Sequence, residues 1–154
     1  MPIALRLTTD GRIVVDGYLS SVLYGARGPI SFLLDTGSQR TILGPRDAET
    51  MGFPVDAFPW YAGPPLFGIG GKAGAFAVGP CQIVLGDADL VADEDVLYFA
   101  PEREVRHRTR GGGRHEARER MFALPSILGT DILMRNECSL HVDWRTRSGA
   151  ILAG

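Results

Sequence analysis

The sequence contains little cysteine, little histidine and no long hydrophobic run. Cys81 and Cys138 are its two cysteines among 154 residues, and they lie too far apart in the chain for a metal-type spacing. We therefore expect free buried thiols and no metal site. No apolar stretch approaches the roughly 20 residues that a membrane-spanning helix needs, so no membrane partner is expected.

An excess of charge of one sign is also missing. The 16 basic and 18 acidic side chains leave a net charge of −2, which argues against a general nucleic-acid binder. Residues 1–7 lack the basic start and the long apolar core of a signal peptide, which predicts a cytoplasmic location. The length and the 45% hydrophobic content suit a single domain over residues 1–154 with a core of its own.

Glycine and proline, in contrast, are abundant, and 20 Gly with 10 Pro predict many turns between short strands. Apolar patterns bounded by these turn residues predict strands or hairpin arms at 3–7, 13–24, 30–34, 41–43, 60–67, 76–78, 82–85, 90–91, 96–99, 139–144 and 150–152. Short helices are expected at 45–51, with Pro45 in the first turn, and at 131–135, capped by Thr130. The expected class is mostly β with one or two short helices.

Residues 102–120 differ in composition from the rest of the chain. This stretch holds seven Arg, four Glu, two His and three consecutive Gly, without an apolar period. We expect an exposed, flexible polar insertion that acts as a solvated linker. The alternatives are a positive arm that recruits acidic substrates, a gate over a cleft, or a site of self-cleavage.

The most informative motif is Leu33-Leu34-Asp35-Thr36-Gly37-Ser38, in which an apolar strand runs directly into an acid. A carboxylate at the end of a buried strand is costly unless it is used. Gly37 permits a sharp turn directly after the acid. The chain contains this arrangement once.

Two further motifs follow it in order, Phe67-Gly68-Ile69-Gly70-Gly71 and Ile127-Leu128-Gly129-Thr130-Asp131-Ile132-Leu133. Together the three resemble the retroviral-type aspartic proteases, the retropepsins, at the spacing of that family and over most of the chain. The resemblance implies a closed acid-protease barrel with a glycine-tipped flap hairpin.

The resemblance also implies a mechanism centred on Asp35. Peptide hydrolysis without a metal needs one carboxylate as base and one as acid, and two carboxylates sharing a proton supply both. Asp131 lies in the helix start after the third motif, a structural position in the family. The second carboxylate is therefore expected from Asp35 of another copy, which makes the protein a two-fold homodimer.

The neighbours of Asp35 have implied roles as well. Thr36 is expected to reach across and hydrogen-bond the opposite loop, and Gly37 lets backbone amides approach the carboxylates. Ser38 is expected to hydrogen-bond the outer oxygen of Asp35 and to lower its pKa. The alternative for either hydroxyl is an ordinary turn residue.

Substrate contacts are expected from the flap and from the cleft wall, at Phe67, Gly68, Ile69, Gly70, Gly71 and Ile127. An ordinary long hairpin is the alternative for the flap. Leu128, Gly129 and Asp131 form the structural second half of the site. The apolar end 150–154 is expected to close a hairpin with 139–144, the alternative being a strand interleaved with a second copy.

One departure from the family involves charge. Retroviral enzymes place an acid soon after the catalytic triplet and an arginine after the later glycine, whereas this chain has Arg40 and Asp131 in those regions. We therefore expect Arg40 to pair with Asp131 and to tie the catalytic loop to the helix. The alternative is two solvated charges.

The function that the resemblance implies is an aspartic endopeptidase that acts on peptide or protein substrates, with water as the nucleophile and no cofactor. The alternative is a catalytically silent retropepsin-like module for peptide binding or dimerisation. The intact Asp35-Thr36-Gly37-Ser38 motif favours the enzyme, because a binding module has no need for costly paired carboxylates.

Overall fold

The computed structural model of the chain describes residues 1–63, 66–68, 71–73, 75–101, 103–105, 120–122 and 124–154, with side chains outside 64–74 and 102–123. The strands are β1 (Ile3–Leu7), β2 (Ile13–Ser20), β3 (Arg27–Leu34), β4 (Ile42–Leu43), β5 (Leu66–Gly68), β6 (Gly71–Ala73), β7 (Phe76–Leu85), β8 (Leu90–Phe99), β9 (Arg103–Val105), β10 (Arg120–Phe122), β11 (Ile127–Leu128), β12 (Ser139–Asp143) and β13 (Ser148–Leu152). The helices are α1 (Pro45–Met51), the 3₁₀ helix η1 (Val55–Ala57) and α2 (Thr130–Arg135).

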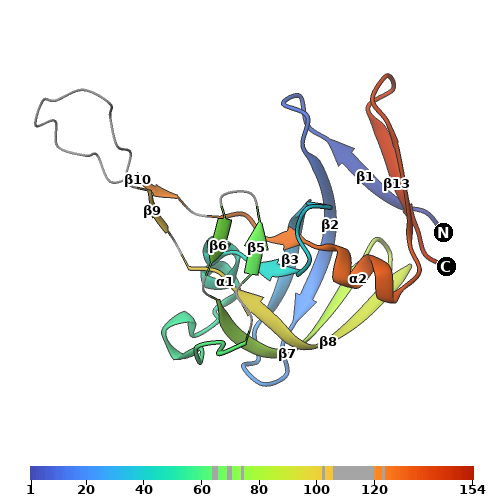
Figure 1. Ribbon diagram of the computed structural model, residues 1–154. Helices are drawn as coiled ribbons and strands as arrows, with labels where there is room; N and C mark the ends of the chain where they lie inside the picture. The colour runs from blue at the N-terminus through green and yellow to red at the C-terminus, as the bar shows by residue number, and fades with distance from the viewer. Residues whose placement is uncertain (64–65, 69–70, 74, 102, 106–119, 123) are drawn as a thin grey trace, which may run out of the picture.

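Strands β2, β3, β11, β4, β8 and β7 form a closed barrel (Figure 1). The ring closes where β2 pairs with β7, with Gly17 opposite Leu85. Two of its pairings are parallel, β11 with β3 and β4 with β8. The predicted fold, a mostly β closed barrel with short helices, is therefore confirmed.

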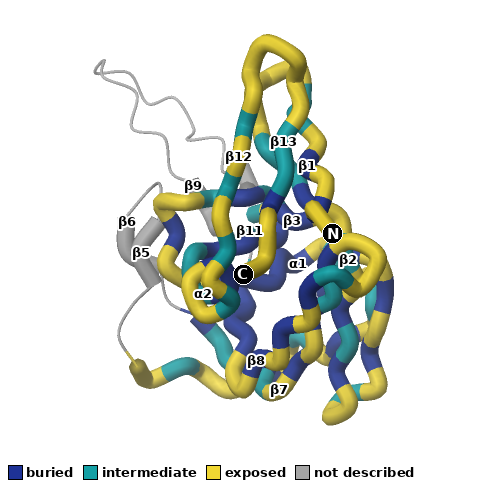
Figure 2. The backbone as a smooth tube through the Cα atoms, turned by 90° about the vertical axis from the view of Figure 1, so that its right-hand side faces the viewer, coloured by how far each residue is buried: buried dark blue, intermediate teal, exposed yellow. Residues whose placement is uncertain are grey.

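The main sheet continues beyond the barrel, from β2 through β1 and β13 to β12. β13 lies between β1, where Ile3 faces Ile151, and β12, where Leu140 faces Ile151. The predicted terminal hairpin is confirmed, and Figure 2 shows it as a largely exposed arm. Its strands meet within one chain, so β13 has neighbours on both of its edges.

The core is filled by alternating residues of the barrel strands. Along β3, Ile30, Phe32 and Leu34 are buried while the residues between them are more exposed, as a strand with one face toward the core requires. A single large cluster joins residues of β1, β2, β3, β7, β8, α1 and α2. This packing fixes the strand that carries Asp35.

Helix α1 has the predicted bounds. Pro45 occupies its first turn, and Gly52 ends it in the left-handed region at φ +81°, where its amide bonds back to the helix. Helix α2 begins one residue earlier than predicted, at Thr130, and the Thr130 side chain makes no capping bond.

Among the described residues, no helix is long and apolar enough to cross a membrane.

Several strand bounds differ from the prediction. β2 ends at Ser20 because the Ser21 amide bonds to Ala26 and Gly25 turns the chain at φ +65°. The two strands predicted at 76–78 and 82–85 are one strand, β7, which continues through Gly79. The pairing of β7 with β8 shifts register on either side of Gly79, and this irregularity accommodates the glycine without ending the strand. The ends of the predicted polar insertion pair with each other as β9 and β10, and residues 106–119 lie outside the described residues.

Candidate active site

Asp35 stands directly after β3 and beside the end of β11. The parallel pairing puts Leu34 opposite Leu128. The Leu33 amide donates to the carbonyl of Ser126 at 2.8 Å, and the Asp35 amide donates to the carbonyl of Leu128 at 3.2 Å. The backbone of Asp35 is therefore held by a segment more than half the chain away.

The carboxylate of Asp35 is fixed by its own turn. The Gly37 amide donates to Oδ1 at 2.9 Å, and the Ser38 amide donates to the Asp35 carbonyl at 3.1 Å. Asp35 is half-buried, whereas Thr36 and Gly37 are exposed. Within the described part of the chain, no other group hydrogen-bonds this carboxylate, so Oδ2 is open to a further partner.

The predicted bond between Ser38 and Asp35 is wrong. The Ser38 hydroxyl is buried and donates to the carbonyl of Arg40 at 2.8 Å, because the turn directs it away from the carboxylate. The Ser38 carbonyl in turn accepts from the Thr130 amide at 2.9 Å and from the Thr130 hydroxyl at 3.3 Å. Ser38 thus braces the loop against the start of α2.

Asp131 is bound by Thr41. The Thr41 amide donates to Oδ2 at 3.0 Å and the Thr41 hydroxyl donates to Oδ1 at 2.7 Å, while the Gly129 amide donates to the same hydroxyl at 3.1 Å. The Ile132 amide is a further donor to Oδ1, at 2.9 Å. Thr41 is 1% exposed, so this group of bonds is a buried clamp between the Asp35 loop and α2.

The predicted ion pair of Arg40 with Asp131 is therefore wrong. The Arg40 side chain is exposed, and its guanidinium carbon lies 5.9 Å from the ring centre of Tyr98. Its backbone, however, touches the site, since a Cβ on Gly129 would lie 2.5 Å from the Arg40 carbonyl carbon and oxygen. Gly129 is needed because this close approach leaves no room for a side chain.

Ser126 links the segment before β11 to the start of helix α1. Its hydroxyl accepts from the Gly44 amide at 2.9 Å and donates to the Asp47 carboxylate. Ser126 is fully buried, and Gly44 is as constrained as Gly129, because its Cβ would lie 2.5 Å from the Leu124 carbonyl oxygen. These contacts fix the segment that leads into Ile127.

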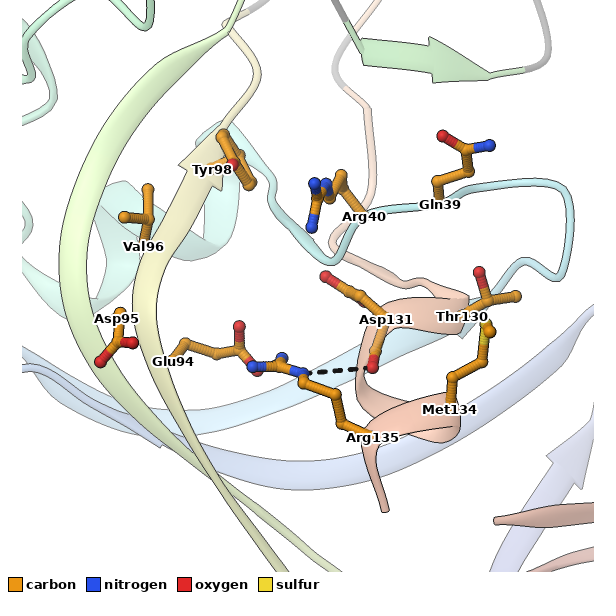
Figure 3. A pocket seen from close by; sticks show the side chains of 10 residues that line it. All are labelled: Gln39, Arg40, Glu94, Asp95, Val96, Tyr98, Thr130, Asp131, Met134 and Arg135. Atoms are coloured by element: carbon orange, nitrogen blue, oxygen red, sulfur yellow. Dashed lines mark hydrogen bonds and ion pairs between the residues drawn. The ribbon is translucent and has the colours of Figure 1, made fainter. Parts of the chain in front are cut away.

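A pocket of about 570 Å³ is lined by residues that include Arg40, Tyr98 and Asp131 (Figure 3). Glu94 of β8 and Arg135 of α2 form an ion pair on its wall, and Glu94 is only 6% exposed. Burial raises the pKa of the Glu94 carboxyl above its ordinary value, an effect that Arg135 partly offsets. Asp35 does not line this pocket.

The two cysteines are free thiols, as predicted, but only Cys81 is fully buried. Burial is the main cause that raises the pKa of Cys81 to about 11, and the charge of Glu94 contributes to the rise. Cys138 is half-buried, and desolvation raises its pKa as well. Neither thiol is an activated nucleophile.

The predicted flap falls on a hairpin. Strands β5 and β6 pair with Phe67 opposite Lys72 and Gly68 opposite Gly71, apart from the main sheet. Ile69 and Gly70 lie outside the described residues. Ile127 is half-buried between Leu33 and Ile42, its partners on the adjacent strands, and Leu128 is fully buried. The structure thus joins the Asp35 loop to the Leu128-Gly129 segment.

The supporting side chains were missed by sequence reasoning. Thr41 was read only as part of the short strand 41–43, Ser126 was given no role, and the pair of Glu94 with Arg135 was not foreseen. The signal that could have found Thr41 and Ser126 is a hydroxyl residue in an otherwise apolar buried run, because a buried hydroxyl needs a hydrogen-bond partner.

Comparison with known proteins supports the fold. No protein-family model and no curated protein matches the chain. Among solved structures, the crystal structure of a retropepsin-like aspartic protease from Rickettsia conorii matches with 19% identity and a TM-score of 0.53. The match covers 100% of this chain and 94% of the other. The barrel described above is thus a retropepsin-like fold.

Proposed function

We propose that this chain is an aspartic endopeptidase that works as a homodimer, with water activated between the Asp35 carboxylates of two copies. The protein is then one domain over residues 1–154, acts in the cytoplasm and needs no cofactor. Its fold supports a protease in general terms, since the structural neighbour is described as an aspartic protease.

The observation that carries the proposal is the presentation of the Asp35 carboxylate. One oxygen is held by the Gly37 amide, and the other is open among the described residues. The loop is clamped from behind by the bonds of Ser38 with Thr130 and of Thr41 with Asp131. A catalytic carboxylate needs this combination of a loop held rigidly in place and one oxygen free to contact water or substrate.

The need for a second copy follows from the chemistry. A single carboxyl group cannot act as the base that deprotonates water and, at the same time, as the protonated acid that polarises the carbonyl. A second carboxyl group is needed. Asp131 is excluded as the partner because its two oxygens are taken by Thr41 and Ile132. The chain has one Asp-Thr-Gly-Ser segment, so Asp35 of a second copy is the remaining source.

The other site residues have roles that follow from this arrangement. Thr36 is exposed beside Asp35 and is proposed to hydrogen-bond the loop of the partner. The β5–β6 hairpin is proposed to close over an extended peptide and to exclude water. Ile127, which lies opposite Leu33 in the parallel pairing, two residues before Asp35, is proposed to line the cleft.

The test is cleavage of a mixed peptide library at acidic and neutral pH by the wild type, Asp35→Asn and Asp87→Asn. Asp87 is an exposed turn residue, so its variant controls for the loss of one carboxylate. We expect Asp35→Asn to lose at least roughly a hundredfold in rate, the usual contribution of acid–base catalysis, and Asp87→Asn to lose nothing.

A mixing experiment tests whether the site is shared. Excess Asp35→Asn added to wild type should suppress its activity, because mixed dimers hold one carboxylate, whereas excess Asp87→Asn should not. Cleavage that persists in Asp35→Asn alone would refute the assignment. A dimeric wild type that cleaves no peptide at either pH would favour the silent binding module.

A further inference from the structure

Arg40 lines the pocket of Figure 3 with a guanidinium that has no anionic partner among the described residues. Its side chain is exposed. Its backbone, in contrast, is fixed, because the Ser38 hydroxyl donates to the Arg40 carbonyl at 2.8 Å and Gly129 lies against the same peptide group. A fixed backbone lowers the ordering cost when the guanidinium binds another group.

The acids that line the pocket leave the charge of Arg40 available. Both oxygens of the Asp131 carboxylate accept hydrogen bonds within the buried clamp. Glu94 is paired with Arg135, toward the opposite end of the pocket from Arg40 (Figure 3). Asp95 follows Glu94 on β8 and is exposed, so water and salt screen its charge. Arg40 can therefore pair with an anion that enters the pocket.

A stack of side chains places Arg40 between the Asp35 loop and the base of the proposed flap. The Arg40 guanidinium carbon lies 5.9 Å from the ring centre of Tyr98, and the rings of Tyr98 and Tyr61 meet edge to face with 4.8 Å between their centres. The Tyr61 amide donates to the Ala75 carbonyl at 2.9 Å, and these two residues stand on either side of the β5–β6 hairpin. An extended peptide between that hairpin and Asp35 therefore passes beside this stack.

The walls around Arg40 suit the apolar stem of a side chain. Tyr98 belongs to a small apolar cluster that also contacts Ile127, the residue proposed above to line the cleft. Val96 and Met134, exposed by 41% and 76%, add apolar surface to the pocket. Its volume of about 570 Å³ lies within the usual range of ligand pockets. The pocket thus extends the proposed cleft sideways and adds one free positive charge to it.

We propose that Arg40 selects substrates with an acidic side chain, a glutamate or an aspartate that enters this pocket while the peptide lies across Asp35. This inference rests on the proposed function and names the class of substrate for the same site. Asp35 does not line the pocket, so the acidic residue lies outside the pair that flanks the scissile bond. The planar guanidinium can bind a carboxylate through two parallel N–H donors, and the Tyr98 ring supports it.

The first test compares the cleavage of peptides that carry either Glu or Gln, placed in turn at each position of a cleaved sequence. The two side chains have the same shape, so the ratio of their kcat/KM values isolates the charge. Near neutral pH, where the substrate Glu is ionised, the wild type should prefer Glu roughly tenfold at one position, because hydrogen bonds to charged groups are stronger.

Variants of Arg40 assign that preference to the pocket. Arg40→Ala should bring the ratio of Glu to Gln down to about one, because the paired charge is gone. Arg40→Glu should prefer Lys at the same position, since the sign of the charge is reversed. Arg46→Glu, the same reversal on exposed α1, is the matched control and should keep the wild-type ratio.

The second test measures binding without cleavage. Fluorescently labelled Glu and Gln peptides are titrated with Asp35→Asn, and anisotropy gives the two dissociation constants. The Glu form should bind roughly tenfold more tightly. Adding Arg40→Ala to the Asp35→Asn background should remove the difference, and adding Arg46→Glu instead should preserve it.

The outcomes separate this inference from the proposed function. Cleavage with no preference for Glu at any position, or a preference that survives in Arg40→Ala, overturns the role of Arg40 and leaves that of Asp35 standing. If no peptide is cleaved, the catalytic assignment fails and the binding assay decides the role of Arg40. A preference for Glu that Arg40→Ala removes then supports it, whereas equal binding of both forms, or none, overturns it.

Discussion

Replacing Thr41 by valine should loosen the candidate site while leaving the core volume nearly unchanged. The change removes one hydroxyl that donates to the Asp131 carboxylate at 2.7 Å and accepts from the Gly129 amide at 3.1 Å. A hydrogen bond to a charged group is worth about 1.5–3 kcal/mol, and an unsatisfied buried donor costs about 1–3 kcal/mol. Relaxation offsets part of the sum, so we expect a loss of about 3 kcal/mol in the free energy of unfolding.

Urea unfolding followed by circular dichroism measures this loss, and thermal melting checks it. For a chain of this size, about 3 kcal/mol corresponds to a fall of roughly 6–12 °C in Tm. Thr50→Val is the matched control, because Thr50 is exposed on α1 and, among the described residues, its hydroxyl bonds only the Arg46 carbonyl of its own helix. That variant should stay within about 0.5 kcal/mol of the wild type.

A double-mutant cycle shows whether the loss comes from the clamp. Combining Thr41→Val with Asp131→Asn should cost less than the sum of the single losses, by about 1 kcal/mol or more, because the two residues share the same bonds. A loss below about 1 kcal/mol for Thr41→Val, or strict additivity with Asp131→Asn, would refute the reasoning.

Two further predictions concern the neighbourhood of this clamp. Gly129→Ala sets a Cβ 2.5 Å from the Arg40 backbone. It should therefore destabilise the protein more than Gly11→Ala, whose Cβ meets nothing within 4 Å and whose cost is only the strain of a side chain at φ +86°. Equal effects in urea unfolding would contradict the close approach. Because burial raises the pKa of Glu94 above 4.5, its contribution to stability is present below pH 4.5 and is lost as pH rises through the folded-state pKa. Glu94→Gln should therefore lack this fall in stability, and parallel pH–stability curves for the two proteins would contradict the prediction.

The parts of the fold that depend on local signals were accessible from the sequence. Helix α1 has its predicted bounds because Pro45 and Gly52 act within a few residues of the helix ends. The barrel was predicted only through the resemblance that the three motifs, in their order and spacing, bear to the retropepsins. In contrast, β7 continues through Gly79, since its pairing with β8 outweighs a local turn signal.

The error at Arg40 has a different origin. Charge signs suggested that Arg40 pairs with Asp131, but successive residues of an extended chain point to opposite sides. Arg40 is exposed and Thr41 is 1% exposed, so the inward residue meets Asp131 with two donors. Charge pattern alone does not reveal which of two neighbours faces inward.

The clamp also sets the order in which the protein can acquire its proposed activity. Thr41 and Asp131 are 90 positions apart, and a ribosome adding about 5–20 residues per second needs roughly 5–18 s to make that interval. During this time Asp35 has been synthesised, but the Leu128 carbonyl that holds its backbone does not yet exist. A chain still being made therefore carries an unformed loop, and it cannot act on other chains emerging nearby.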